Sequence, residues 1–164
     1  MHSFVYMEQA CILEDSNVMT AGEKNILLAD DEKIFLLSVS EGLRMYMKSV
    51  NIYTADNGRS ALDILKSCPI DLLVTDLNMP EMDGFGLLER KYAEFPDTKV
   101  LVFTACILPG YREMLKNYGV LDVLEKPLSF EELRSKVEGA LWGLSGMDNQ
   151  MQNEPGAFWG RSLS

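Results

Sequence analysis

The segment DLLVTDLNMPEMDG, residues 71–84, joins a short run of leucine and valine to an acidic loop that contains proline and glycine. The apolar run predicts a strand over residues 71–75, and its nearly continuous apolar character indicates burial on both faces of a sheet. Asp76 follows this strand directly. The sequence therefore predicts a carboxylate at the carboxyl end of a buried strand.

Short apolar runs alternate with amphipathic stretches on both sides of this segment, which is the arrangement expected of βαβ units. Together they predict an α/β fold of the doubly wound kind, in which five parallel strands form one sheet with helices on both faces. The other four predicted strands span residues 26–29, 50–55, 99–104 and 120–124.

Helical periodicity is visible between the strands, because apolar residues recur there every three or four positions. The last helix also has a start signal, since Ser129 and Glu132 match a capping box downstream of Pro127. A short, weakly patterned helix is expected over residues 109–118, with Gly119 as its stop. The predicted apolar stripes are Leu36, Val39, Leu43 and Met47; Ala61, Leu62 and Leu65; and Leu133, Val137, Ala140, Leu141 and Leu144.

The pattern predicts one domain over residues 24–144. Residues 1–23 carry a charge of −4 and lack periodicity, so we expect either a disordered extension or a wrongly assigned start, with Met19 as the alternative start. Residues 145–164 have the polar composition of a flexible tail. Because 20 residues follow Leu144, and a DNA-binding output module needs roughly 60, we expect no output domain.

The composition narrows the possible functions. The chain has 164 residues, 47% of them hydrophobic, with 15 basic and 25 acidic side chains and a net charge of −10, which disfavours nucleic-acid binding. No apolar run approaches the roughly 20 residues of a membrane span, and no secretory signal is visible, so we expect a cytoplasmic location. Three cysteines without a CxxC pair disfavour a disulfide framework or a zinc site and predict small buried or half-buried residues at Cys11, Cys68 and Cys106.

Polar side chains follow four of the predicted strands, at the edge where functional groups of a parallel sheet gather. The first strand ends in Asp30 and Asp31, the third in Asp76, the fourth in Thr104 and the fifth in Lys126. Three carboxylates at an apolar edge repel one another, and a divalent cation would relieve that repulsion. Oxygen ligands without His or Cys favour Mg²⁺ or Mn²⁺, and the cluster as a whole indicates phosphoryl chemistry.

Each of these residues also has an ordinary structural role. An Asp-Asp pair alone is most often a helix N-cap with a solvated neighbour, and Asp76 alone could cap the turn before Pro80. A Lys-Pro step is usually a loop, and a threonine that ends a strand is usually a β-former. Their joint placement at the ends of four strands favours a functional site over coincidence.

Four motifs, in their order along the chain, resemble the receiver domain of bacterial two-component response regulators, a flavodoxin-like family of five βα units. The resemblance covers residues 24–144, with Asn57-Gly58 before Ala61-Leu62 as a weaker match. The motifs are LLADDE at residues 27–32, DLLVTDLNMP at 71–80 followed by MDG at 82–84, VFTA at 102–105, and KPL at 126–128.

The resemblance implies a phosphoacceptor site. Asp76 would be the nucleophile that forms an acyl phosphate, Lys126 would pair with the phosphoryl oxygens, and Thr104 would donate a hydroxyl hydrogen bond to them. The phosphoryl donor would be a phosphohistidine on a sensor histidine kinase or on a histidine phosphotransfer protein.

The resemblance also implies a metal site. Asp31, the carboxylate of Asp76 and the main-chain carbonyl of Asn78 would hold Mg²⁺, with Asp30 close by or acting through water. Mn²⁺ is the alternative cation, as the oxygen ligands already suggest.

Smaller features add to the expected geometry of the site. Ala105 would leave room beside the acceptor, and Gly84 fits an unusual backbone conformation in the loop, although simple packing and turn chemistry account equally well for both residues. The bond between Lys126 and Pro127 is a candidate for a cis peptide.

One position departs from the family pattern. Many receivers carry Tyr or Phe three residues before the lysine, and Val123 stands at that position here. The signal would then pass through a shift of the loop over residues 106–110 or through repacking. Tyr111, Leu115 and Tyr118 face either the output surface or, as is commoner at helical spacing, the core.

The predicted function is that of a stand-alone receiver, a signalling domain rather than an enzyme, which changes its affinity for an unknown downstream protein. A homodimer is left open. The alternative is a Mg²⁺-dependent phosphohydrolase of the haloacid dehalogenase type, although that family carries Asp-x-Asp after its first strand and here Asn78 lies two positions after Asp76. A flavin-binding function is a weaker alternative, because the turn after Ala29 is acidic where a phosphate-binding loop would carry Gly, Ser or Thr.

Overall fold

A computed structural model describes residues 23–143 of the chain. Its five strands form one parallel sheet, as predicted, and five helices alternate with them. The strands are β1 (Lys24–Ala29), β2 (Val50–Ala55), β3 (Leu72–Thr75), β4 (Lys99–Thr104) and β5 (Val120–Glu125). The helices are α1 (Lys33–Tyr46), α2 (Gly58–Ser67), α3 (Gly84–Glu94), α4 (Tyr111–Lys116) and α5 (Phe130–Trp142).

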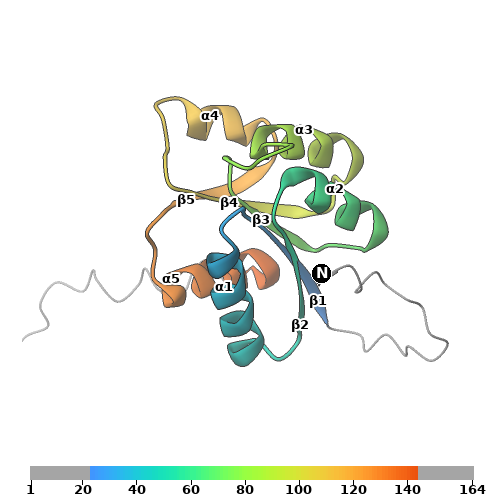
Figure 1. The fold of residues 1–164 in the computed structure, drawn as a ribbon, viewed down its shortest axis with the longest axis vertical. Coiled ribbons are helices and arrows are strands. Elements are labelled where there is room, and N and C mark those ends of the chain that lie inside the picture. The colour runs from blue at the N-terminus through green and yellow to red at the C-terminus, as the bar shows by residue number, and fades with distance from the viewer. Residues whose placement is uncertain (1–22, 144–164) are drawn as a thin grey trace, which may run out of the picture.

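The strands lie in the order β2-β1-β3-β4-β5. Helices α1 and α5 cover one face of the sheet, and α2, α3 and α4 cover the other (Figure 1). The direction of winding therefore reverses between β1 and β3, and ligands of such sheets bind outside the carboxyl ends of the strands at that reversal. This confirms the predicted doubly wound fold.

Each face of the sheet has its own apolar core. Leu27, Leu73 and Val102 belong to the cluster beneath α2, α3 and α4, whereas Leu28 and Val74 belong to the cluster beneath α1 and α5. Successive residues of one strand thus enter opposite clusters, which is the reason that the central strands β1, β3 and β4 contain nearly continuous apolar runs, whereas the edge strands β2 and β5 also carry exposed residues. Within residues 23–143, no helix combines the length and apolar character needed to cross a membrane.

The predicted helical stripes are confirmed, since their members on α1, α2 and α5 are buried or, at Ala140, partly buried. The capping box of Ser129 and Glu132 at the start of α5 is also present. The side chains of Asn57 and Asp83 cap α2 and α3. The described residues do not include the two flanks, 1–22 and 144–164, and therefore do not include Cys11, the alternative start at Met19 or Leu144.

The fourth helix is shorter than the predicted residues 109–118. Of the two placements left open for Tyr111, Leu115 and Tyr118, packing in the core is the one observed. Leu115 is fully buried, and the partly buried rings of Tyr111 and Tyr118 pack against the cluster beneath α2, α3 and α4. Cys68 is buried as predicted, but Cys106 is exposed because it lies in the loop that follows β4.

Gly84 is required for close packing and not for an unusual backbone conformation. It is absent from the glycines with positive φ, and the left-handed residue of this loop is Glu81, with φ of 64°. A Cβ atom at Gly84 would lie 2.2 Å from the main-chain oxygen of Asp76 and 2.6 Å from the Cα of Leu77. The start of α3 therefore touches the backbone that carries Asp76, so a side chain here would displace that backbone.

Lys91 interrupts the apolar face of α3. It follows Gly84, Leu87 and Leu88 on the buried side of the helix and is 3% exposed. Its ammonium has a long hydrogen bond of 3.5 Å to the carbonyl oxygen of Pro96. Burial lowers the pKa of Lys91 below its ordinary value, and the charge of Asp97 opposes this shift incompletely.

We therefore expect Lys91→Leu to raise the free energy of unfolding by about 1–3 kcal/mol at pH 7, because a poorly paired ammonium no longer has to be buried. The unfolded chain binds the proton of Lys91 more tightly than the folded chain, so the stability of the natural protein rises as pH approaches the ordinary lysine pKa. The difference between the two proteins should shrink accordingly. Urea unfolding at pH 7 and at higher pH measures both effects.

Lys66→Leu is the matched control, because Lys66 is an exposed lysine on α2 and should change stability by about 0.5 kcal/mol or less. A Lys91→Leu variant less stable than the natural protein at pH 7 would show that the buried ammonium is net stabilising.

Candidate functional site

The hydrogen-bond ladder of the sheet continues one residue past the ends of β1 and β3. Ala29 and Thr75 are paired across these strands. The amide of Asp30 donates to the carbonyl of Ala55 at 3.0 Å, and the amide of Asp76 donates to the carbonyl of Ala29 at 2.9 Å. The backbone therefore holds the two aspartates side by side, at the point where the winding of the sheet reverses.

Lys126 reaches these aspartates from the opposite side of the edge. Its amide donates to the carbonyl of Thr104 at 2.8 Å, which extends the pairing of β4 and β5, and the bond to Pro127 is cis, as predicted. Its ammonium nitrogen lies 2.6 Å from Asp30 Oδ2, 3.2 Å from Asp76 Oδ2 and 3.2 Å from Glu32 Oε1. The three hydrogens of the ammonium thus have three carboxylate acceptors.

The ion cluster of Lys126 with Asp30, Asp76 and Glu32 is largely buried, except for Glu32. The side chain of Asp30 is 2% exposed and that of Lys126 is 13% exposed, whereas Glu32 is largely exposed. Burial raises the pKa of Asp30, and the hydrogen bonds from Lys126 and from the amide of Glu32 offset this only in part. Burial acts to lower the pKa of Lys126, but Asp30 and then Asp76 outweigh it, so the pKa lies above the ordinary lysine value.

The two oxygens of Asp76 have different surroundings. Oδ1 accepts hydrogen bonds from the amides of Leu77 at 2.6 Å and Asn78 at 3.2 Å, whereas Oδ2 faces Lys126. Asp76 therefore makes the bonds of a turn cap and belongs to the charged cluster at the same time. The amide bonds fix the direction in which the carboxylate points.

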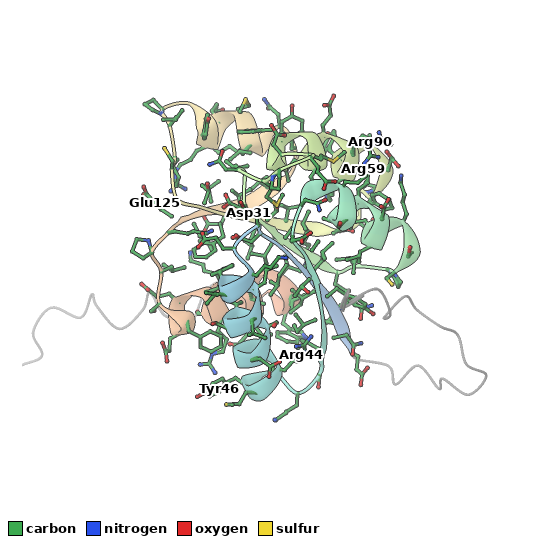
Figure 2. All side chains as sticks on the ribbon, in the orientation of Figure 1. Asp31, Arg44, Tyr46, Arg59, Arg90 and Glu125 are labelled. Carbon is green, nitrogen blue, oxygen red and sulfur yellow. The ribbon has the colours of Figure 1, made fainter. Side chains whose placement is uncertain are left out.

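The acidic pair at the end of β1 does not cap a helix. The N-cap of α1 is Glu32, which makes no side-chain capping bond, and Asp30 Oδ1 accepts from the Glu32 amide at 2.9 Å. Asp31 is exposed at the site end of α1, opposite the end that carries Arg44 and Tyr46 (Figure 2). The two aspartates are therefore available for another role.

Three carboxylates meet at this edge in a way that suits a hard cation. Ligand oxygens of Asp30, Asp31 and Asp76 all lie within 4.8 Å of one another. Carboxylate oxygens without nitrogen or sulfur ligands favour Mg²⁺ or Mn²⁺ over zinc or copper. The residues predicted from the strand ends thus fit such an ion, and the role of the Asn78 carbonyl stays a prediction.

Thr104 lies at the end of β4 and is fully buried. Within residues 23–143, its hydroxyl oxygen has no hydrogen-bond partner. A buried hydroxyl without an acceptor is uncommon because leaving it unpaired costs free energy. The observation is compatible with an acceptor that is present in another state of the protein.

Sequence reasoning missed three residues that contact Lys126. Glu32 lies in the LLADDE motif, which gives no sign that its carboxylate is an acceptor for the ammonium. The rings of Phe35 and Phe103 lie with their centroids 4.8 Å and 5.4 Å from the Lys126 nitrogen. An aromatic residue in an apolar stripe carries no sequence signal for such a contact.

Val123 lies on β5 at the position where many receivers carry Tyr or Phe. Its side chain is buried in the apolar cluster beneath α2, α3 and α4.

Comparison with known proteins supports the same interpretation. The family model described as response regulator receiver domain matches residues 26–138. The probable chemotaxis protein CheY of Rhizobium etli is 29% identical over 130 residues, which cover 77% of this chain and 99% of that protein. The transcriptional regulatory protein ZraR of Escherichia coli K12 is 36% identical over 124 residues, covering 75% of this chain and 27% of that protein.

The sensor histidine kinase TmoS of Ectopseudomonas mendocina is 31% identical over 120 residues, covering 69% of this chain and 12% of that protein. The chain thus spans about a quarter or less of the length of TmoS and ZraR. Among solved structures, the receiver domain of an HD domain-containing protein from Pseudomonas fluorescens Pf-5 has a TM-score of 0.67 and 27% identity, and the match covers 73% of this chain and 94% of that chain.

We expect Lys126→Met to lower the free energy of unfolding by about 3 kcal/mol at pH 7, because it keeps an apolar stem but leaves buried carboxylates without their cation. Protonation of Asp30, whose pKa is already raised, would relieve the repulsion. The loss should therefore be large above the folded pKa of Asp30 in the variant and shrink as pH falls through it. Urea unfolding at several pH values measures this dependence.

Lys136→Met is the control, since the ion pair of Lys136 with Asp122 at 2.9 Å is largely exposed and should contribute about 1 kcal/mol or less. Equal losses in the two variants would contradict a special role for the Lys126 cluster.

Proposed function

The chain belongs to the response regulator receiver domain family, and we propose that it accepts a phosphoryl group on Asp76 from a phosphohistidine. The donor would be a sensor histidine kinase or a histidine phosphotransfer protein. The observation that carries the proposal is the oriented carboxylate of Asp76, with one oxygen held by two amides and the other facing Lys126. The acidic cluster and the unpaired hydroxyl of Thr104 support it.

In the proposed step, an oxygen of the Asp76 carboxylate attacks the phosphorus of the phosphohistidine. A phosphorus–oxygen bond forms as the phosphorus–nitrogen bond breaks, and the electron pair of the broken bond stays on the imidazole nitrogen, which takes a proton from solvent. The products are an acyl phosphate and histidine. Lys126 would offset the charge on the transferring group, and the Thr104 hydroxyl would donate to a phosphoryl oxygen.

A divalent cation is part of this proposal. Receiver domains generally bind Mg²⁺ through acidic residues, and here Asp30, Asp31 and Asp76 would hold it with the carbonyl of Asn78. When bound, Mg²⁺ or Mn²⁺ neutralises charge on the phosphoryl oxygens. Three aspartate carboxylates gather here, and among the described contacts the single ammonium of Lys126 pairs with two of them, which favours a further cation.

The proposed output is a change in contacts with a downstream protein, in a cytoplasmic setting. Phosphorylation adds about two negative charges at an edge that already holds three aspartates. Lys126 then has a stronger partner than Asp30 or Glu32, and Thr104 gains an acceptor. Because Val123 is not aromatic, a ring on β5 does not report the movement of Thr104, and the signal passes through the loop after β4 or through repacking.

We expect the protein, incubated with Mg²⁺ and a small phosphodonor such as acetyl phosphate, to gain one phosphoryl group per chain. Asp76→Asn should abolish this gain, because an amide is a poor nucleophile, whereas Asp63→Asn on the exposed side of α2 should not. Intact mass measures the gain, and release by hydroxylamine identifies an acyl phosphate.

Undiminished labelling of Asp76→Asn would overturn the assignment. Continuous hydrolysis of a phosphate monoester that requires Asp76 would instead support the phosphohydrolase alternative.

The metal site gives a separate prediction. A concentration of Mg²⁺ at 100 times its Kd should stabilise the folded protein by about 2.7 kcal/mol, and Asp31→Asn should remove most of this gain because one ligand charge is lost. The affinity should fall as pH drops through the raised pKa of Asp30, since protons compete with the cation. Thermal unfolding with and without Mg²⁺ measures both effects, with Asp63→Asn as control. An equal gain for Asp31→Asn would place the ion elsewhere.

A further inference from the structure

Two aromatic rings cover the side of Lys126 that the carboxylates leave free. The Lys126 nitrogen lies 4.8 Å from the centroid of Phe35 and 5.4 Å from that of Phe103. The two rings contact each other, with centroids 5.2 Å apart and planes inclined at 36°. Phe35 comes from the first turns of α1 and Phe103 from β4, so parts of the chain far apart in sequence form one aromatic pair around the ammonium.

Phe103 belongs to the core beneath α1 and α5, and the partly buried Phe35 packs against that core, which restricts the movement of both rings. Phe103 is 3% exposed, and Phe35 packs against the same buried cluster as Leu28 and Val74. The rings, Asp30 and Asp76 border a cavity of about 10 Å³, which has room for one water molecule at most. The ammonium therefore has carboxylates on one side and a fixed aromatic wall on the other.

The chemistry of this wall suits a lysine that must transfer its hydrogen bonds to an incoming anion. The negative face of an aromatic ring attracts a cation but accepts no strong hydrogen bond. A carboxylate or a water molecule in the same place would compete with the phosphoryl oxygens for the hydrogens of the ammonium. The rings also keep water away, which strengthens the attraction between Lys126 and the anion.

We propose that Phe35 and Phe103 are positioning residues, which hold the ammonium of Lys126 at the phosphoacceptor site while leaving its hydrogens available to the phosphoryl group. This inference rests on the proposed phosphorylation of Asp76. It assigns to α1 and β4 a part in the reaction that neither the acidic residues nor the hydroxyl of Thr104 supplies.

A packing role alone predicts different behaviour. If the rings served only to fill space, leucine would replace either one at the same cost as at another ring of this layer. Phe130 offers that comparison, because its ring contacts the ring of Tyr46, with centroids 5.7 Å apart and planes inclined at 43°, and Tyr46 lies at the end of α1 opposite Asp31 (Figure 2). The electrostatic face of the ring, rather than its volume, is the property to be tested.

The experiment replaces Phe35 by mono-, di- and trifluorinated phenylalanine, which keep the shape of the ring but progressively weaken its negative face. The rate constant of Asp76 phosphorylation by acetyl phosphate, at saturating donor and Mg²⁺, should fall with each added fluorine. Phe35→Leu should lower it about fivefold, whereas Phe130→Leu should leave it within about twofold. The Hε protons of Lys126 should show an upfield ring-current shift in the NMR spectrum that Phe35→Leu reduces.

A rate that stays constant across the fluorinated series, in a protein whose Asp76 is labelled normally, would overturn the positioning role. An Hε shift that is unchanged by Phe35→Leu would overturn it too, because the ring would then not face the lysine. Absence of labelling in the natural protein would instead overturn the proposed function on which the inference rests.

Discussion

The ammonium of Lys126 holds together an edge of the sheet at which buried carboxylates would otherwise repel one another. Its nitrogen contacts oxygens of Asp30, Glu32 and Asp76, which come from the ends of β1 and β3 and from the start of α1. Such a cluster exists because the ladder of the parallel sheet continues beyond both strands and fixes the two aspartates next to each other. The sheet order, not the local sequence, brings Lys126 to them from β5.

The surrounding core makes this arrangement both costly and useful. Two apolar clusters, one on each face of the sheet, exclude water from the bases of these side chains. Burial raises the pKa of Asp30 even though Lys126 donates to it at 2.6 Å, so the cost of removing this carboxylate from water exceeds what the ammonium returns. A largely buried group of carboxylates favours the binding of a further cation and keeps the compensating lysine protonated.

If Asp76 is phosphorylated as proposed, a receiver without an aromatic residue at position 123 would pass on the effect through Lys126. Its ammonium contacts Asp76, the acidic cluster and the aromatic pair of Phe35 and Phe103. The rings connect it to the layer of α1 and α5, whereas Thr104 and the loop after it lead toward α4. A shift of the ammonium would thus alter contacts with the helices on both faces of the sheet.

Periodicity and short spacings in the sequence are enough to predict the five strands, the apolar stripes, the capping box of α5 and the set of polar residues at the strand ends. The sequence did not determine the extent of α4 or the exposure of Cys106, and it left two placements open for Tyr111 and Tyr118, because packing against distant residues sets these features. The folded structure was needed to see that Gly84 packs closely against the backbone of Asp76, that Lys91 is buried and that two phenylalanine rings flank Lys126. These contacts join residues that are many positions apart, and hydrophobic periodicity carries no record of which side chain on one element meets which on another.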